Sequence, residues 1–273
     1  MKMDELMGNP TSVQIFNVIT ETPQSKTLQF SLKGPIEFQP GQFVMVWVPG
    51  VDEIPMSVSS WNPPEMGITI QSIGEATQAL VSMSKGDWIG IRGPFGNPFS
   101  ANSKKSLVVG GGVGIAPLKP LVYNLLDEGS EVTLVIAAQT KNELIFLEEF
   151  EKLKHPNFKI EIATDDGSLG FKGFATGAVA ELLDGNEFDT MYTCGPEVMM
   201  AGLHDIANKG KIGFQASLER FMKCGCGICG TCAMDPTGQL VCADGPVFTG
   251  EQLAGLTNFG KYHRDAVGMK KEC

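Results

Sequence analysis

Five of the seven cysteines in this chain lie within one short segment. The stretch KCGCGICGTC, residues 223–232, holds four of them, and a fifth follows at Cys242 in VCADG. An odd total and such crowding do not suit a set of disulfides, and the N-terminal MKMDELMGNP has neither the basic start nor the apolar run of a secretory signal. The segment therefore predicts thiolate ligation of a soft metal in a reducing compartment, with the cytoplasm as the expected location.

The spacing of these cysteines admits more than one kind of metal site. Four of them give C-x4-C-x2-C…C, the plant-type spacing for a 2Fe–2S cluster: Cys224, Cys229, Cys232 and Cys242. A second frame begins at Cys226 and reads C-x2-C-x2-C, the start of a bacterial 4Fe–4S run, although no C-P follows. A structural zinc site would usually show two separated C-x2-C pairs, so iron–sulfur is favoured over zinc.

Composition limits the kind of protein that this chain can be. It has 273 residues, of which 42% are hydrophobic and 19% are charged, so it is long enough for two modest domains with packed cores. The formal net charge is −10 and there is no Lys/Arg cluster, which argues against nucleic-acid binding. The most apolar stretch, Ser106 to Leu118, is short and rich in glycine, so no membrane-spanning segment is expected.

The first hundred residues have the composition of short strands. Runs rich in Val, Ile, Phe and Thr, such as TSVQIFNVITE and QFVMVWV, are separated by Pro and Gly. Most of them follow one another with no helix between, which favours an antiparallel barrel or sandwich. One helical interruption is expected, over residues 77–84.

Strands and helices alternate after the polar link SANSKK. SLVVG, EVTLVIAA, FKIEIAT and DTMYTC are strand-like, and helical segments such as PLKPLVYNLLDEG and the one around ELIFLEEFEKL stand between them. This order predicts a doubly wound parallel sheet with helices on both faces. Regular patterns stop at about Gly213. The expected domains are an antiparallel β-barrel over residues 1–101, an α/β domain over 102–214 and a small C-terminal segment over 215–273.

Two loops of the α/β region each follow a strand and precede a helix. GGGVGIAP runs from Gly110 to Pro117, and its glycines would let the backbone approach a phosphate at the N-terminus of the helix. CGPEVMM, from Cys194 to Met200, is the second, and open parallel sheets bind ligands at the carboxyl ends of their strands. The alternatives are a tight strand–helix turn for the first loop and a small buried residue for Cys194.

Together these motifs resemble the ferredoxin-reductase-like flavoprotein family. GGGVGIAPL followed by CGPEVMM is similar to its pyridine-nucleotide domain, and PGQFVMVWVPG with IPMSVSS is similar to its flavin domain. MKCGCGICGTC…VCADGPVF is similar to the cluster-binding tail of dihydroorotate dehydrogenase electron-transfer subunits. The resemblance runs nearly end to end, and it implies a barrel that binds FAD, an α/β domain that binds NAD and a C-terminal segment that binds a 2Fe–2S cluster.

The resemblance assigns flavin-binding residues to the barrel, with two departures. Ile54 stands where the family's R-P-x-S stretch has arginine, and Gln71 stands where the family has a second arginine. The whole chain has only three arginines, at 92, 220 and 264, and none is an obvious substitute, so weaker FAD binding is expected. The residues that the resemblance places at FAD are Pro55, Met56, Ser57, Thr69, Ile70, Gln71, Gly74, Ala76 and Thr77.

The nicotinamide cofactor is expected to be NAD rather than NADP. Lys141 is the single basic residue in AAQTKNE, and the stretch TDDGS, which holds Asp165, is acidic, which suits a free ribose hydroxyl. The resemblance places Cys194 at the nicotinamide as the catalytic residue. The other residues assigned to NAD are Gly110, Gly111, Gly112, Gly114, Pro117, Asp165, Gly195 and Pro196.

The resemblance also selects the plant-type cysteine frame and implies a function. Cys224, Cys229, Cys232 and Cys242 become the 2Fe–2S ligands, and Cys226 and Cys273 become free thiols. NAD exchanges electron pairs as hydride, the cluster exchanges single electrons, and FAD can do both. The implied function is an oxidoreductase subunit that passes electrons from dihydroorotate to NAD for pyrimidine biosynthesis. Its implied partner is an FMN-containing catalytic dehydrogenase subunit, two of each forming a heterotetramer.

Two alternatives remain open. Similar chains serve as reductase subunits of the sulfide dehydrogenase, hydrogenase or ferredoxin–NAD(P) reductase type, and the motifs do not separate them. A cluster-bearing sensor without catalytic activity is the alternative from another class, and the two missing arginines favour it.

Overall fold

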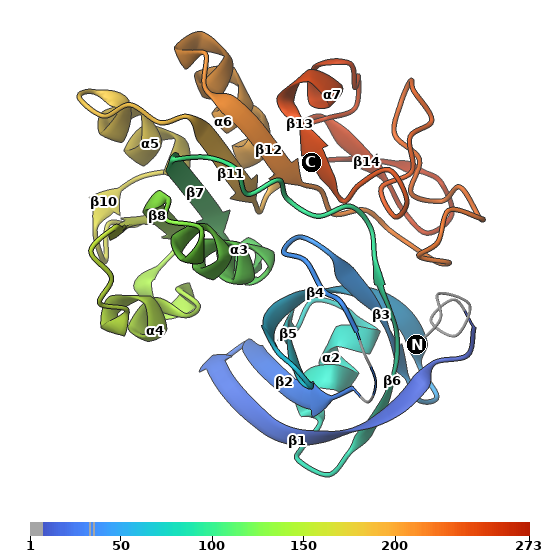
Figure 1. The fold of residues 1–273 in the computed structure, drawn as a ribbon. Coiled ribbons are helices and arrows are strands. Elements are labelled where there is room, and N and C mark those ends of the chain that lie inside the picture. The colour runs from blue at the N-terminus through green and yellow to red at the C-terminus, as the bar shows by residue number, and fades with distance from the viewer. Residues whose placement is uncertain (1–7, 33, 35) are drawn as a thin grey trace.

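The first part of the chain forms a closed β-barrel (Figure 1). The computed structural model describes residues 8–32, 34 and 36–273. Six antiparallel strands close the barrel in the order β1-β2-β5-β4-β3-β6, so the architecture is the barrel and not the sandwich. Alternate residues point inward, as the almost fully buried Ile68 and Ile70 of β5 do. The strands are β1 (Thr11–Thr22), β2 (Ser25–Ser31), β3 (Phe43–Val48), β4 (Asp52–Asn62), β5 (Glu65–Gln71) and β6 (Trp88–Phe95).

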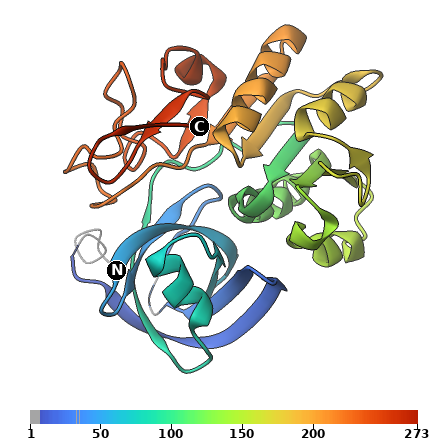
Figure 2. The ribbon, with the colours of Figure 1, turned by 180° about the vertical axis from the view of Figure 1, so that it is seen from behind.

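The second part is a seven-stranded sheet with helices on both faces (Figures 1 and 2). Its order is β10-β9-β8-β7-β11-β12-β13, and only β12 and β13 pair antiparallel. Leu107 and Val109 of β7 pack with α5 and α6, whereas Val108 packs with α3 and α4 on the other face. The doubly wound sheet predicted from the sequence is confirmed. The elements are β7 (Lys105–Gly111), η1 (Gly112–Gly114), α3 (Ile115–Asp127), β8 (Glu131–Ala138), η2 (Lys141–Glu143), α4 (Leu147–Lys152), β9 (Phe158–Thr164), β10 (Phe171–Lys172), α5 (Ala175–Leu183), β11 (Thr190–Cys194), α6 (Glu197–Gly210), β12 (Gly213–Ser217) and β13 (Val247–Thr249).

The direction in which the sheet grows reverses between β7 and β11. β8 and β9 extend it from β7 on one side, and β12 extends it from β11 on the other. At the carboxyl ends of these strands Cys194 pairs with Gly110 on one side and with Ser217 on the other. The connections that follow β7, β11 and β12 therefore all start at this switch point, the place where open α/β sheets bind ligands.

The C-terminal part has more regular structure than the sequence indicates. β12 and β13 join the main sheet, α7 (Gly250–Ala254) follows, and β14 (Tyr262–Arg264) pairs with β15 (Lys270–Glu272). These elements span three to five residues each, which is too short for a visible periodicity, and the strands depend on partners supplied by the fold. β12 extends across the predicted boundary between residues 214 and 215, and the domain limits stay a prediction.

Two predicted helices differ from the observed ones. α2 (Glu75–Ser82) begins before Thr77, because the Thr77 hydroxyl caps it from inside the first turn. The helix expected around ELIFLEEFEKL is only α4, because Phe146 lies in the left-handed region with φ 61° and interrupts the turn before it.

Among the residues that the structure describes, no helix combines the length and the apolar character needed to cross a bilayer.

The close approach of two switch-point loops gives a testable prediction. A Cβ on Gly114 would lie 2.4 Å from the carbonyl oxygen of Cys194, although the Gly114 φ of −60° suits any residue. We expect Gly114→Ala to lower the free energy of unfolding by about 1–3 kcal/mol, the usual cost of overpacking, in urea denaturation.

Gly255→Ala is the control, since its φ is −80° and the nearest atom to its Cβ would be 3.5 Å away. Equal losses in both variants would contradict the close-contact explanation.

Candidate functional site

A cavity of 590 Å³ lies between the barrel and the sheet. Most of its lining comes from three parts of the chain: β4, β5 and α2 of the barrel, η1 with the first turn of α3, and the segment 217–223 that begins at the end of β12. The lining is more apolar than polar, with a few charged side chains, as is usual for a cofactor site. This cavity is therefore the place where the predicted flavin and nicotinamide residues can meet.

Most of the residues predicted to bind FAD line this cavity. Ile70 is the exception within β5, because its side chain points into the barrel core. Gly74 and Ala76 lie at the start of α2 and are not among the lining residues. Ile54, at the position of the first missing arginine, also borders the cavity. The predicted residues that line it are Pro55, Met56, Ser57, Thr69, Gln71 and Thr77.

The N-terminus of α2 is organised by its own threonine. The Thr77 hydroxyl accepts hydrogen bonds from the backbone N–H groups of Gly74 and Ile73, at 2.9 and 3.0 Å. It donates in turn to the Gly74 carbonyl oxygen at 2.9 Å. Thr77 therefore shapes the backbone at this end of the cavity.

Two cationic side chains border the cavity, and the sequence alone did not indicate them. Arg220 and Lys223 both line it, so the expectation that no substitute for the missing arginines stands nearby is wrong. Arg220 binds both carboxylate oxygens of Glu197, with 2.7 Å between Nη2 and Oε1. Its buried Nε has no hydrogen-bond partner among the described residues.

The predicted NAD residues converge on the switch point. Gly114 and Cys194 are in near contact, Gly111 packs against Pro196, and Gly195 has φ 147°, which favours glycine. Pro117, in the first turn of α3, lines the cavity. Gly110 and Gly112 lie at the end of β7 and the start of η1. Asp165 is exposed directly after β9, at the same edge of the sheet but outside the cavity lining.

Cys194 is fully buried in the core beneath these loops. Burial raises the pKa of its thiol well above the ordinary value, and the nearby Glu219 carboxylate acts in the same direction. The thiol is therefore neutral at physiological pH and is not poised as a nucleophile. Cys194 is not among the cavity-lining residues, and its contact with the nicotinamide stays a prediction.

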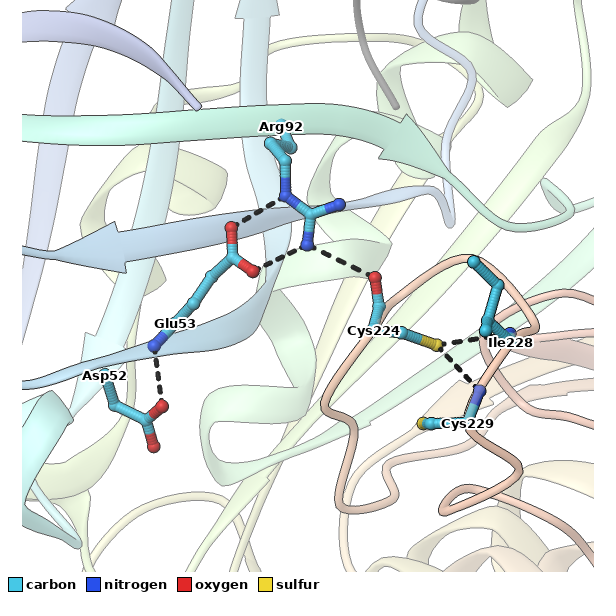
Figure 3. A network of polar contacts seen from close by, with 6 residues as sticks. All are labelled: Asp52, Glu53, Arg92, Cys224, Ile228 and Cys229. Atoms are coloured by element: carbon cyan, nitrogen blue, oxygen red, sulfur yellow. Dashed lines mark hydrogen bonds and ion pairs between the residues drawn. The ribbon is translucent and has the colours of Figure 1, made fainter. Parts of the chain in front are cut away.

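Four cysteines of the C-terminal segment fall into two pairs. Cys224 Sγ accepts from the backbone N–H groups of Ile228 and Cys229, at 3.3 and 3.5 Å (Figure 3). Cys232 and Cys242 are buried with their sulfur atoms 3.3 Å apart. This arrangement suits a 2Fe–2S cluster, because its four thiolates are shared between two irons.

Backbone N–H groups favour thiolates in this segment. Burial raises the pKa of Cys224, but the N–H groups of Cys226, Cys229 and Ile228 outweigh it and lower the pKa to about 6. The hydrogen bond between the two sulfur atoms lowers the pKa of Cys232 to about 6 and raises that of Cys242, so this pair shares one proton. Metal binding requires deprotonated thiols, and Cys224 and Cys232 are the two whose thiolates the fold favours.

The glycines between the cysteines make this loop possible. Gly225, Gly227 and Gly230 have φ values of 71°, 81° and 71°, and the Gly227 N–H donates to Cys242 Sγ at 3.2 Å. In the described part of the chain, no three His, Cys, Asp or Glu side chains are arranged to hold one metal ion.

Comparisons with known proteins identify the family. Residues 219–254 match the iron-sulfur cluster binding domain of dihydroorotate dehydrogenase B, and residues 108–205 match the oxidoreductase NAD-binding domain. A probable dihydroorotate dehydrogenase B (NAD(+)), electron transfer subunit, from Methanocaldococcus jannaschii is 46% identical over 97% of this chain and 99% of its own. The chain belongs to the family of dihydroorotate dehydrogenase B electron transfer subunits.

Further relatives agree with this family. The subunit of the same name from Methanothermobacter thermautotrophicus is 42% identical over 97% of this chain and 98% of its own. A solved NADH-dependent reduced ferredoxin-NADP oxidoreductase is 31% identical, with a TM-score of 0.80 over 90% of both chains. The predicted fold class, the oxidoreductase role and the cofactor set of FAD, NAD and a 2Fe–2S cluster are confirmed.

One charged residue of this family member was missed in the sequence. Glu219 follows Ser217 and Leu218 at the end of β12, lines the cavity and lies close to Cys194. Burial raises the pKa of its carboxyl, although Arg220 beside it acts in the opposite direction. The residue is nevertheless exposed where it borders the open cavity, so solvent weakens this effect on its pKa. The sequence signal for Glu219 was weak, because one Glu-Arg pair after a short strand does not indicate a site. Its place at the cavity depends on the pairing of β12 with the sheet.

Glu219 gives a prediction about stability and pH. Its carboxyl has a raised pKa in the folded chain, so the ionised form costs stability at high pH and nothing at a pH below the unfolded value of 4.5. Because solvent reaches this side chain, we expect Glu219→Gln to raise the melting temperature of the cofactor-free protein only slightly at pH 7–8, and this gain to vanish as the pH falls to about 4.5. Scanning calorimetry across this pH range measures the effect.

Glu187→Gln replaces a glutamate that lies outside the cavity lining and is the control. A gain for Glu219→Gln that did not depend on pH would contradict the role of its charge.

Proposed function

We propose that this chain passes electrons between a partner dehydrogenase and NAD, through a 2Fe–2S cluster and FAD, in the oxidation of dihydroorotate to orotate. The observation that carries the proposal is that the segment leading into the cysteine loop also forms part of the cavity wall. Met222 and Lys223 line the cavity, and the first cluster ligand, Cys224, follows them directly in the chain. Over the whole reaction, dihydroorotate loses two electrons and two protons, NAD takes both electrons with one proton as hydride, and one proton is released.

The barrel side of the cavity would hold FAD, which exchanges both hydride and single electrons. Ser57 supplies a hydroxyl, and the loop capped by Thr77 presents the N-terminus of α2. The Thr69 hydroxyl, by contrast, is already bonded to Ser59. Lys223 supplies a positive charge that Ile54 and Gln71 do not, whereas the guanidinium of Arg220 is already paired with Glu197. These residues favour a dinucleotide with a charged diphosphate.

The switch point would hold NAD. Gly110, Gly111, Gly112 and Gly114 shape the loop before α3, and Gly195 and Pro196 face them. The backbone N–H of Lys141 donates to Ser168 at 2.8 Å, which joins the loop after β8 to the acidic stretch around Asp165. This acidic edge supports a preference for NAD over NADP.

The cysteine segment would hold the 2Fe–2S cluster through Cys224, Cys229, Cys232 and Cys242. Cys229 is exposed, and Ile228 beside it is 80% exposed, so one end of the site faces outward. An FMN-bearing catalytic subunit could approach this end, and two copies of each subunit would form a heterotetramer. Reduced thiols in such number suit the cytoplasm.

A second candidate function is a ferredoxin–NAD(P) reductase subunit. It is favoured by the likeness to the reduced ferredoxin-NADP oxidoreductase, with its TM-score of 0.80. The two candidates differ in the protein that exchanges electrons at the exposed end of the cluster site.

Co-expression with the partner subunit tests the proposal. The complex should contain FMN, FAD and two irons per copy of this chain, and dihydroorotate should reduce NAD faster than NADP. Reduction of a dye by NADH should need this chain alone. Activity with ferredoxin but not with dihydroorotate would favour the second candidate, and absence of flavin and iron after reconstitution would refute both.

The cysteine frame is tested by single replacements. We expect Cys224→Ser to lose or distort the cluster, because Cys224 Sγ already receives two backbone hydrogen bonds. Cys226→Ser should leave the iron content and the EPR spectrum nearly intact. About four irons per chain, or the reverse effect of the two replacements, would show that the second frame is the right one.

A further inference from the structure

The loop that carries Cys224 rests on two neighbouring positions of the barrel wall. Arg92 of β6 donates from Nη2 to the backbone oxygen of Cys224 at 3.2 Å (Figure 3). Gly225 packs on Met45 of β3 so closely that a Cβ on it would lie 2.6 Å from Met45 Cγ. Met45 and Arg92 are cross-strand partners. The start of the cysteine loop is therefore fixed to the barrel and not only to the sheet that precedes it.

The position of the Arg92 side chain is fixed by Glu53 of β4. Nε and Nη2 donate to the two carboxylate oxygens of Glu53, at 2.8 and 2.5 Å. The Arg92 and Glu53 side chains are only 10% and 22% exposed, and the guanidinium lies 5.6 Å from the centre of the Phe95 ring. A bidentate pair in such a place is well ordered and weakly screened.

This ion pair joins the two parts of the electron path. Glu53 lines the large cavity, while Arg92 contacts the cysteine loop. The Glu53 backbone N–H in turn donates to Asp52 Oδ1 at 2.8 Å, and Asp52 also lines the cavity. Replacing either Glu53 or Arg92 should therefore alter both the cavity lining and the support of the cysteine loop.

All three arginines are paired with a carboxylate, and Arg92 differs from the other two in that it also contacts the cysteine loop. Arg220 is paired with Glu197, and Arg264 with Asp235. Arg92 Nη2 donates both to a Glu53 carboxylate oxygen and to the Cys224 backbone oxygen, so the guanidinium lies between Glu53 and the cysteine loop. It therefore brings a positive charge to the inner edge of the cysteine loop.

We propose that Arg92, held by Glu53, is a positioning residue for the iron–sulfur cluster and also raises its reduction potential. The inference rests on the proposed function, because it takes Cys224 as a cluster ligand. Reduction adds one negative charge to a cluster, so a nearby cation stabilises the reduced form and a nearby anion opposes it. The two members of the pair should therefore shift the potential in opposite directions.

An EPR-monitored redox titration of the complete, cofactor-loaded protein tests this. We expect Arg92→Gln to lower the midpoint potential of the cluster, Glu53→Gln to raise it, and Arg92→Lys to leave it near the parent value. Loosening of the loop alone would move the potentials of Arg92→Gln and Glu53→Gln in the same direction. Lys119→Gln is the charge-matched control, because it removes a cation of α3 that is paired with Glu149 of α4 at 2.5 Å. It should not change the midpoint potential of the cluster.

The outcomes separate this inference from the proposed function. A parent protein without iron would refute the proposed cluster. A parent protein with its cluster, but with shifts that are absent or of equal sign in the two variants, would overturn the inference alone. If Arg92→Gln loses iron and Arg92→Lys keeps it, the positioning role is supported, and the sign of the Glu53→Gln shift still decides the role of charge.

Discussion

The pairing of β11 with its two neighbours is the constraint on which the functional parts of this chain depend. Cys194 stands in register with Gly110 of β7 and with Ser217 of β12. Parallel strands in register end together, so the glycine loop, the Cys194 loop and the segment after Ser217 begin side by side. A shift of one residue in either pairing would turn the buried residues of that strand to the opposite face, which the two packed cores forbid.

The segment after β12 connects the remaining parts. Glu219 and Arg220 face the cavity, Arg220 is tied to Glu197 at the start of α6, and Cys224 is tied to the barrel through Arg92. The cavity therefore obtains its charged residues from a stretch with little regular structure. Such a stretch keeps its shape because its ends are anchored to rigid elements.

The sequence predicts those features that depend on local pattern. A succession of short strands with few helices between them predicted a barrel or sandwich, and the alternation of strands and helices predicted the parallel sheet. The glycines around Gly114 predicted a ligand-binding loop at the end of a strand. Features that depend on distant partners were missed. Arg92 and Cys224 are 132 positions apart, and Arg220 reaches the cavity only because β12 joins the sheet. The helix that became α4 was predicted too long for a local reason. No residue around Phe146 indicates that its backbone lies in the left-handed region.

The two strands that flank the cysteine segment also affect how a metal could be installed. β12 enters the segment and β13 leaves it, and the two are hydrogen-bonded to each other, with a further bond from the Leu218 N–H to the Pro246 oxygen. The sheet therefore holds the two ends of the cysteine segment together. The loop-closure entropy of this segment is lost when the sheet folds, and not when a metal binds. Iron binding then needs to order only the residues between β12 and β13. A chain that loses its iron should keep this sheet, and a new cluster could form without refolding.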